Sequence, residues 1–242
     1  MMIKLITFDL DDTLWDNMPV LIRAEQKAWK RLCEYWPETH ERMNPKEVFE
    51  YRVKLLAERP ELKCQITELR RFSLQKILQN CDCPGSRAEE IAGDLMREFM
   101  EWRHDVKCFP EVQPVLSHLS ADYTLAAVTN GNVDVGKLSV SEFFDFSIRA
   151  EDFNSLKPEP TLFLKAMERA GVTPEETLHV GDCLKADVGG AGALGIGTVW
   201  FNPADKEFNG ERRPDYEIRS LTGLLRVLDK DLQHDYGSVL GA

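Results

Sequence analysis

Residues 4–14 of the chain read KLITFDLDDTL, an apolar run that ends in three carboxylates and a threonine. A run this short, rich in β-branched and aromatic residues, is typical of a buried strand. The strand would present Asp9 and Asp11 together at its carboxyl end. Such carboxylates repel each other unless a cation neutralises them, and Mg²⁺ favours one or two carboxylates with water and substrate phosphate. An acidic loop that follows a strand is the alternative interpretation of this stretch by itself.

The composition is that of a globular protein of one or two domains. The chain has 242 residues, 43% of them apolar and 29% charged. No apolar run approaches the ~20 residues of a membrane span, and the amino terminus lacks the long apolar segment of a signal peptide. We therefore expect a cytoplasmic protein that does not bind membranes. The net charge of −11 also argues against nucleic acid as a partner, because phosphate backbones would be repelled.

The cysteines give no sign of a structural zinc site. They lie at positions 33, 64, 81, 83, 108 and 183 and lack paired C-x-x-C spacing. Reduced thiols are the expectation in the cytoplasm, and Cys81 and Cys83 are assigned to a loop.

The first half of the chain is helical in pattern. Between Pro19 and about Asp105, apolar residues recur near the 3.6-residue period, with breaks at prolines. The pattern predicts about four amphipathic helices, at about 19–36, 45–58, 66–80 and 87–102. We expect the aromatic residues of this region in its core: Trp29, Trp36, Phe72, Phe99 and Trp102.

From Phe109 onward, strands and helices alternate. Strands are predicted at 123–129, 146–149, 177–182 and 197–201, with helices at about 111–119, 160–170 and 185–194. This alternation is typical of a doubly wound parallel sheet, which binds ligands beyond the carboxyl ends of its strands. The first strand must join this sheet. We therefore expect an α/β fold, with residues 1–16 and 106–242 forming the sheet domain and residues 17–105 an inserted helical bundle.

Polar residues follow three of these strands and would gather at one edge of the sheet. They are Asp9 and Asp11, Thr129 and Asn130, and Asp182 with Asp187. Lys157 lies between the second and third groups, and we place it at the start of a helix, where backbone N–H groups also favour an anion. In this company Lys157 becomes the positive site that a small anionic ligand would need.

In these residues the chain resembles the haloacid dehalogenase (HAD) superfamily. Its four motifs appear in order: DLDDT at 9–13, a strand that ends in Thr129, Lys157, and GDCLKAD at 181–187. The resemblance covers the whole length and includes a helical cap inserted after the first motif, which would act as a lid.

The resemblance implies a role for each residue. Asp9 would be the nucleophile, and Asp11 the general acid and base. Thr129, Asn130 and Lys157 would bind the phosphoryl group of the substrate. Mg²⁺ would be bound by the metal set: Asp9, the backbone carbonyl of Asp11, Asp182 and, directly or in support, Asp187.

The chemistry of phosphoryl transfer accounts for these residue types. Charge spreads over the equatorial oxygens in the transition state, where a cation, a lysine and hydroxyl donors stabilise it. An aspartate nucleophile divides hydrolysis into two displacements, and a second carboxyl group such as Asp11 can serve both as acid and base. Dehalogenases of the superfamily resemble this chain in their nucleophile but generally lack the second aspartate and need no Mg²⁺. The sequence therefore favours a Mg²⁺-dependent phosphatase.

Other functions are weighed against this one. Phosphonate hydrolysis would use a cap lysine, for which the candidates are Lys27, Lys30, Lys54 and Lys63. Residues 190–195 spell G-x-G-x-x-G, a dinucleotide-binding fingerprint, but they lie well past the preceding strand and inside a predicted helix, where small residues would allow close packing. A scaffold without catalysis would need a broken motif, and none is broken.

The substrate is less well defined than the chemistry. We expect a small phosphorylated metabolite. The run from Asp11 to Asn17 and the size of the cap resemble the bacterial branch of phosphatases that act on FMN and riboflavin-pathway phosphates. Sugar phosphates and nucleoside monophosphates are the alternatives. Residues 15–18, at the hinge into the cap, are candidates for substrate contact, with hinge packing as the alternative for Trp15. The sequence does not define the oligomeric state.

Overall fold

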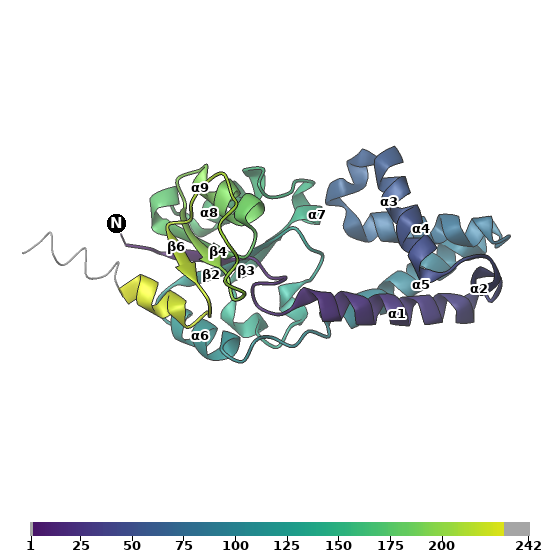
Figure 1. Cartoon of the computed structure of the whole chain (residues 1–242), viewed down its shortest axis with the longest axis horizontal. Helices are drawn as coiled ribbons and strands as arrows, with labels where there is room; N and C mark the ends of the chain where they lie inside the picture. Colours follow the sequence, from purple (N-terminus) through teal and green to yellow (C-terminus); the bar gives the residue numbers. More distant parts are fainter. Residues whose placement is uncertain (1, 230–242) are drawn as a thin grey trace, which may run out of the picture. The chain divides into compact units, whose positions relative to one another are not determined.

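The computed structural model describes residues 2–229 of the chain. The chain divides into two compact units, and the colours of Figure 1, which follow the sequence, show which segments form each unit. The core unit comprises Met1–Asp16 with Lys107–Ala242, and the helical unit comprises Asn17–Val106. Among the described residues, no helix combines the length and the apolar character that crossing a membrane requires.

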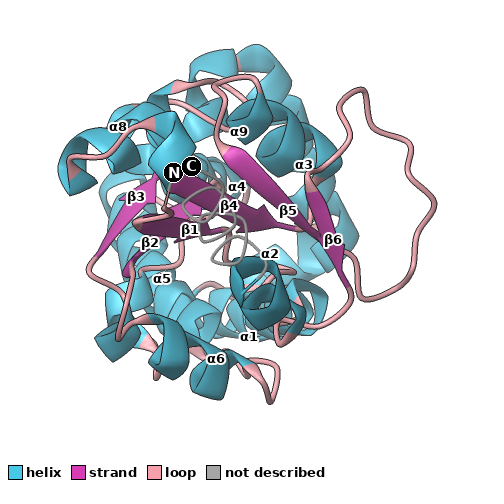
Figure 2. Cartoon of the chain, turned by 90° about the vertical axis from the view of Figure 1, so that its left-hand side faces the viewer, coloured by secondary structure: helices cyan, strands magenta, loops and turns pink. Residues whose placement is uncertain are grey.

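The core unit contains a six-stranded parallel sheet with the strand order β3-β2-β1-β4-β5-β6. The predicted α/β fold with a doubly wound parallel sheet is confirmed. Figure 2 shows α8 and α9 on one side of this sheet and α6 on the other. The strands are β1 (Leu5–Phe8), β2 (Thr124–Thr129), β3 (Phe146–Arg149), β4 (Thr177–Gly181), β5 (Gly197–Phe201) and β6 (Tyr216–Ile218).

The burial of the strands explains which of them the sequence reveals. All residues of β1 and β4 are buried. β1 reads as an apolar run broken only by Thr7, whereas β4 also carries the polar residues Thr177 and His179. The edge strand β6 has three residues, of which only Ile218 is buried. It was not predicted, because a strand this short and exposed has no apolar run.

Short helices connect the strands of the core unit. Asp187 belongs to the π-helix η5, and the short helix that follows it contains the first three residues of the glycine motif. The helical segments are α6 (Val112–Leu119), η2 (Val135–Lys137), η3 (Ser141–Phe143), α7 (Ala150–Phe153), α8 (Thr161–Ala170), η4 (Pro174–Glu176), η5 (Leu184–Gly189) and α9 (Gly190–Gly192).

The glycine motif serves packing. A Cβ atom on Gly190 would lie 2.9 Å from the Pro158 Cα, and one on Gly192 would lie 2.2 Å from the Arg212 Nε. Gly195 has a φ of +80°, in the left-handed region that favours glycine. The motif therefore lies at the end of a helix that contacts its neighbours closely, and not in a turn between a strand and a helix as a dinucleotide fingerprint would.

The helical unit has four long helices, at the predicted positions. Its main apolar cluster joins residues of α1, α4 and α5, including Leu32, Leu78 and Phe99. Phe99 is buried there, whereas Trp29, Trp36 and Trp102 pack against the cluster while partly exposed. The helical segments are α1 (Asn17–Tyr35), α2 (Glu38–Arg42), α3 (Pro45–Glu58), η1 (Pro60–Cys64), α4 (Ile66–Asn80) and α5 (Gly85–His104).

Candidate active site

Three neighbouring strands bring candidate residues to one edge of the sheet. β1 lies between β2 and β4. Asp9 follows β1, Thr129 ends β2, and Asp182 follows β4. The backbone N–H of Asp9 donates to the Val180 carbonyl oxygen at 2.9 Å, which continues the pairing of β1 with β4 as far as the aspartate. The parallel sheet therefore sets these three residues at its carboxyl edge.

Lys157 reaches this edge from the segment between α7 and α8. Its buried ammonium group donates to Asp9 Oδ1 at 2.7 Å, to Asp187 Oδ1 at 2.7 Å and to the Val128 carbonyl oxygen at 2.6 Å. All three acceptors lie in the core unit, so one cation links two carboxylates that are far apart in the sequence.

The placement of Lys157 at the start of a helix was wrong. Helix α8 begins at Thr161, and the four residues from Lys157 to Pro160 are not helical. Two prolines, Pro158 and Pro160, explain the difference, because a residue before proline is disfavoured in the helical conformation. The positive charge at the site therefore comes from the lysine side chain and not from a helix terminus.

Asp187 binds three donors with its two oxygens. Oδ1 accepts from Lys157 Nζ and from His179 Nε2, the latter at 3.1 Å, and Oδ2 accepts from the backbone N–H of Cys183 at 2.9 Å. Gly181 leaves the space for this carboxylate, since a Cβ atom there would lie 2.3 Å from the Asp187 Cγ. This contact explains why a glycine precedes Asp182 in the fourth motif.

His179 and Thr7 belong to this network and were missed by the sequence analysis. His179 Nδ1 lies 2.8 Å from Thr7 Oγ1, across the β1–β4 pair. Burial lowers the pKa of His179, so we treat the imidazole as neutral, with Nε2–H donating to Asp187 and Thr7 donating to Nδ1. The available signal in the sequence was weak: a polar residue inside each of two buried strands, Thr7 in β1 and His179 in β4.

The carboxylates at the edge carry more negative charge than Lys157 neutralises. Burial raises the pKa of Asp9 above its usual range against the opposing effect of Lys157, and Asp187 adds to the increase. Burial and then Asp187 raise the pKa of Asp182 to about 6. The pKa of Lys157 itself rises, because the two carboxylates outweigh the effect of its burial. A further cation would relieve this repulsion.

The donor set fits a divalent metal ion. Oxygen atoms of Asp9, Asp182 and Asp187 lie within 4.8 Å of one another, and carboxylate oxygens are the ligands that Mg²⁺ prefers. Asp187 already accepts from Lys157, His179 and Cys183, so a supporting position suits it better than direct ligation. That the backbone carbonyl of Asp11 binds the metal ion stays a prediction.

The carboxylate of Asp11 is oriented by the residue at the hinge. Trp15 Nε1 donates to Asp11 Oδ1 at 3.1 Å, and Trp15 is 1% exposed. Of the two interpretations of Trp15, hinge packing agrees with this burial, and stacking on a substrate ring does not. The indole holds a carboxyl group that the sequence analysis assigns to acid–base chemistry.

Thr129 and Asn130 lie beside Lys157 but use their side chains differently. The Thr129 hydroxyl is buried and accepts from the backbone N–H of Gly131 at 2.9 Å. The Asn130 side chain accepts from the Lys157 backbone N–H at 2.7 Å and donates to the Lys157 carbonyl oxygen at 3.0 Å. Asn130 thus braces the segment that carries the lysine. Substrate contacts of Thr129 and Asn130 stay predictions.

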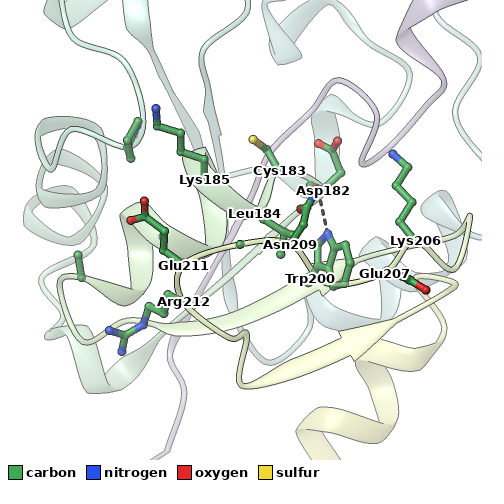
Figure 3. Close-up of a pocket in the computed structure, with 14 residues that line it drawn as sticks. Asp182, Cys183, Leu184, Lys185, Trp200, Lys206, Glu207, Asn209, Glu211 and Arg212 are labelled. Atoms are coloured by element: carbon green, nitrogen blue, oxygen red, sulfur yellow. Dashed lines mark hydrogen bonds between the residues drawn. The ribbon is translucent and has the colours of Figure 1, made fainter.

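A cavity of about 840 Å³ opens beside Asp182 within the core unit. Figure 3 shows Asp182, Cys183 and Lys185 along one part of it and the loop from Lys206 to Arg212 along another. The Trp200 Nε1–H donates to the Asp182 carbonyl oxygen at 2.9 Å, drawn as a dashed line in the figure, and so anchors the backbone of Asp182.

Comparisons with known proteins agree with this geometry. A family model described as haloacid dehalogenase-like hydrolase matches residues 3–195. The 5-amino-6-(5-phospho-D-ribitylamino)uracil phosphatase YigB of Escherichia coli is 30% identical, over 93% of this chain and 96% of its own. A glyceraldehyde 3-phosphate phosphatase of Methanopyrus kandleri is 28% identical, over 95% of this chain and 100% of its own.

A solved structure is similar over the whole fold. It is a 2-haloacid dehalogenase from Pseudomonas syringae pv. Tomato DC3000, with 40% identity and a TM-score of 0.90. The match covers 95% of this chain and 99% of that one. The chain is therefore similar both to proteins named as phosphatases and to a protein named as a dehalogenase.

Proposed function

The chain belongs to the haloacid dehalogenase-like hydrolase family, as a phosphatase of that family, and we propose that it hydrolyses a riboflavin-pathway phosphate or FMN with Mg²⁺ as cofactor. The proposal rests on the convergence of the Asp9, Asp182 and Asp187 carboxylates, two of which, Asp9 and Asp187, bind the buried lysine Lys157. The similarity to YigB over nearly the full length supports the substrate class.

The proposed reaction has two displacements. A carboxylate oxygen of Asp9 attacks the phosphorus atom, the bond to the ester oxygen breaks, and Asp11 gives that oxygen its proton. Asp11 then takes a proton from water as the water attacks the aspartyl phosphate, which releases phosphate and restores Asp9. Trp15 supports this assignment of Asp11, because its indole orients the carboxyl group.

Lys157 and the metal ligands serve the transferred group. Lys157 holds the Asp9 carboxylate through Nζ at 2.7 Å and brings positive charge to the place where the phosphoryl oxygens would lie. Asp9, Asp182 and the Asp11 backbone would hold Mg²⁺, with Asp187 in support. When bound, the ion would supply positive charge that offsets the negative charge of the phosphoryl group.

The substrate is a small phosphorylated metabolite, and a cytoplasmic location is in keeping with six free thiols. Sugar phosphates are a second substrate class, favoured by the similarity to the glyceraldehyde 3-phosphate phosphatase. Nucleoside monophosphates are a third substrate class, which the substrate panel described below also tests.

Dehalogenation is the second candidate reaction, because a solved relative with 40% identity carries that name. Both reactions would use Asp9 as the nucleophile. They differ in what happens at the leaving group: an alkoxide needs a proton, whereas a halide does not. The carboxyl group of Asp11, held by Trp15, has a use only in the first.

A panel of substrates tests the proposal. Phosphate release is measured from FMN, the riboflavin-pathway phosphate, sugar phosphates and nucleoside monophosphates, with Mg²⁺ or EDTA, and halide release from 2-chloropropionate. We expect the highest kcat/KM for one of the two flavin-pathway substrates. EDTA should abolish turnover, and added Mg²⁺ should restore it. Ca²⁺ should inhibit the enzyme, because its looser coordination would let the Asp9 carboxylate turn away from the phosphorus atom. Halide release without added metal, together with no phosphate release, would show that the protein is a dehalogenase and not a phosphatase.

A further inference from the structure

The helical unit contains a partly buried cluster of charges that no step of the proposed reaction uses, in which the Glu25 side chain is 37% exposed. Glu25 of α1 accepts from Arg52 of α3 and from Arg70 of α4. The distances from Glu25 Oε1 are 2.8 Å to Arg52 Nη1 and 2.6 Å to Arg70 Nη2. Three helices of the unit therefore meet at a single carboxylate.

The cluster holds more positive charge than Glu25 neutralises. Both arginine side chains are only 11% exposed, and the two share one carboxylate oxygen. The Nε atoms of Arg52 and Arg70 are buried, and within residues 2–229 no hydrogen-bond acceptor reaches either of them. A guanidinium group taken out of water without acceptors for its N–H groups is unfavourable, so an additional anion would stabilise this arrangement.

The surroundings of Arg70 add to the positive potential and fix its plane. Burial, and then the charges of Arg52 and Arg103, lower the pKa of Arg70 to about 9 against the effect of Glu25. The Arg70 guanidinium carbon lies 3.9 Å from the centroid of the Phe99 ring, so the ring covers one face of the guanidinium group. Ligands must then approach the edge of the guanidinium, where its N–H groups point.

We propose that Arg52 and Arg70, with Glu25 between them, form a binding site for a small oxyanion, a phosphate or a carboxylate. An oxyanion matches the planar N–H groups of arginine and would accept from the Nε–H groups. The two side chains are 11% exposed, but their Nε atoms have almost no accessible surface, so these side chains must shift for the ion to reach the Nε–H groups. Glu25 competes for the same donors and so sets the affinity. The proposal concerns the helical unit alone and does not depend on the proposed reaction.

The test observes the Nε–H groups themselves. The full chain, labelled with ¹⁵N and kept in EDTA, is titrated with inorganic phosphate, and the arginine Nε–Hε resonances are followed by NMR. We expect saturable shifts for Arg52 and Arg70. Arg31 is the internal control, since its Nε already donates to Glu98 at 2.9 Å on the same unit. A parallel titration with NaCl corrects for ionic strength.

Three variants should affect phosphate binding in three different ways. Arg70→Met should weaken phosphate binding by about tenfold or more, as expected for the loss of a charged hydrogen bond. Glu25→Gln should strengthen it, because the competing carboxylate is gone. Arg31→Met removes the same charge from the surface of the unit and should leave binding unchanged. Circular dichroism confirms that each variant is folded, and the titration of the parent chain stands even if one is not.

The outcomes show whether the site binds an anion and whether that anion is free or part of an organic ligand. Saturable shifts with inorganic phosphate identify a site for a free oxyanion. Shifts only with a phosphate monoester that carries a carboxylate, titrated into Asp9→Asn in EDTA, identify a site for an acidic group of an organic ligand. Both results support the proposal. Unchanged Arg52 and Arg70 resonances with both probes, or shifts that NaCl reproduces, would overturn it.

Discussion

Each of the two units holds a cluster of charges, buried in the core unit and partly buried in the helical unit, and the two clusters have opposite signs. In the core unit, one lysine lies among the carboxylates of Asp9 and Asp187, with Asp182 close by. In the helical unit, one glutamate lies between Arg52 and Arg70. The first cluster has an excess of negative charge and the second an excess of positive charge. Since buried charge is costly unless it is paired, each cluster favours a ligand of the opposite sign.

The two clusters also differ in how they are held. In the core cluster, the ends of adjacent strands set the positions of Asp9 and Asp182. Backbone groups of Cys183 and Val128 bind the side chains of Asp187 and Lys157 directly. In the helical cluster, long side chains from three helices meet, and Arg52 and Arg70 bind Glu25 through side-chain atoms. Rigid positioning suits chemistry at a defined atom. The looser cluster suits the binding of an anion.

The largest expected effect is the loss of the nucleophile from the core cluster. Asp9→Asn is nearly isosteric but cannot attack phosphorus, so kcat should fall by about 10⁴-fold or more. Phosphate release is measured with Mg²⁺, and the far-ultraviolet circular dichroism should match that of the parent. Unaltered turnover in the purified variant would remove Asp9 from the mechanism.

Asp11→Asn should act on a different step. The loss of the acid and base should lower kcat for alkyl phosphates by about 10²–10⁴-fold. Aryl phosphates, whose leaving groups need no proton, should still phosphorylate Asp9, and the covalent intermediate should then accumulate. Mass spectrometry of the quenched enzyme detects the added phosphoryl group. Hydrolysis of alkyl phosphates at the parental rate would show that the role given to Asp11 is wrong.

Removal of the helical unit separates selectivity from chemistry. We propose that residues 17–105 act as a lid. A short linker in their place should leave slow hydrolysis of an activated aryl phosphate while discrimination among natural monoesters is lost. The kcat/KM values for the substrate panel measure this, after circular dichroism has confirmed that the core is folded. A core that kept the parental ranking would place selectivity in its own loops, with the cavity beside Asp182 as the first candidate.

A smaller effect is expected at the hinge. Trp15→Phe removes the N–H that donates to Asp11 at 3.1 Å, and kcat should fall by about tenfold, with KM little changed. Trp36→Phe is the matched control, because the Trp36 indole donates to the Cys81 carbonyl oxygen within the helical unit. Equal losses in the two variants would mean that Trp15 acts only through stability.

The smallest effect concerns the stability of the helical cluster. Burial would raise the pKa of Glu25, but Arg70 and Arg52 lower it below its ordinary value of 4.5. Ionised Glu25 therefore stabilises the fold above pH 4.5, and this contribution is lost as the pH falls through the lowered pKa. Urea midpoints of Glu25→Gln should lie slightly below those of the parent at pH 7 and converge with them in acid. A difference that is independent of pH would exclude this charge effect.

The sequence predicted the elements that have a local signature. A short apolar run revealed β1, both faces of which are buried, and the alternation of strand and helix patterns after Phe109 revealed β4. Periodic apolar residues revealed the four long helices of the inserted unit. The candidate residues of the core cluster could also be found, since a parallel sheet brings the carboxyl ends of adjacent strands to one edge whatever the sequence distance between them.

Only the tertiary structure decided which partner each polar group has. Thr7 and His179 are 172 positions apart, and Asn130 braces Lys157 across 27. Arg70 reaches Glu25 across 45 positions. Each of these residues is ordinary in its local sequence, because a hydrogen bond or an ion pair between distant residues leaves no periodicity to read. The chain by itself therefore determined which residues stand at the ends of the strands. Folding determined which of them are neutralised, oriented or left short of a partner.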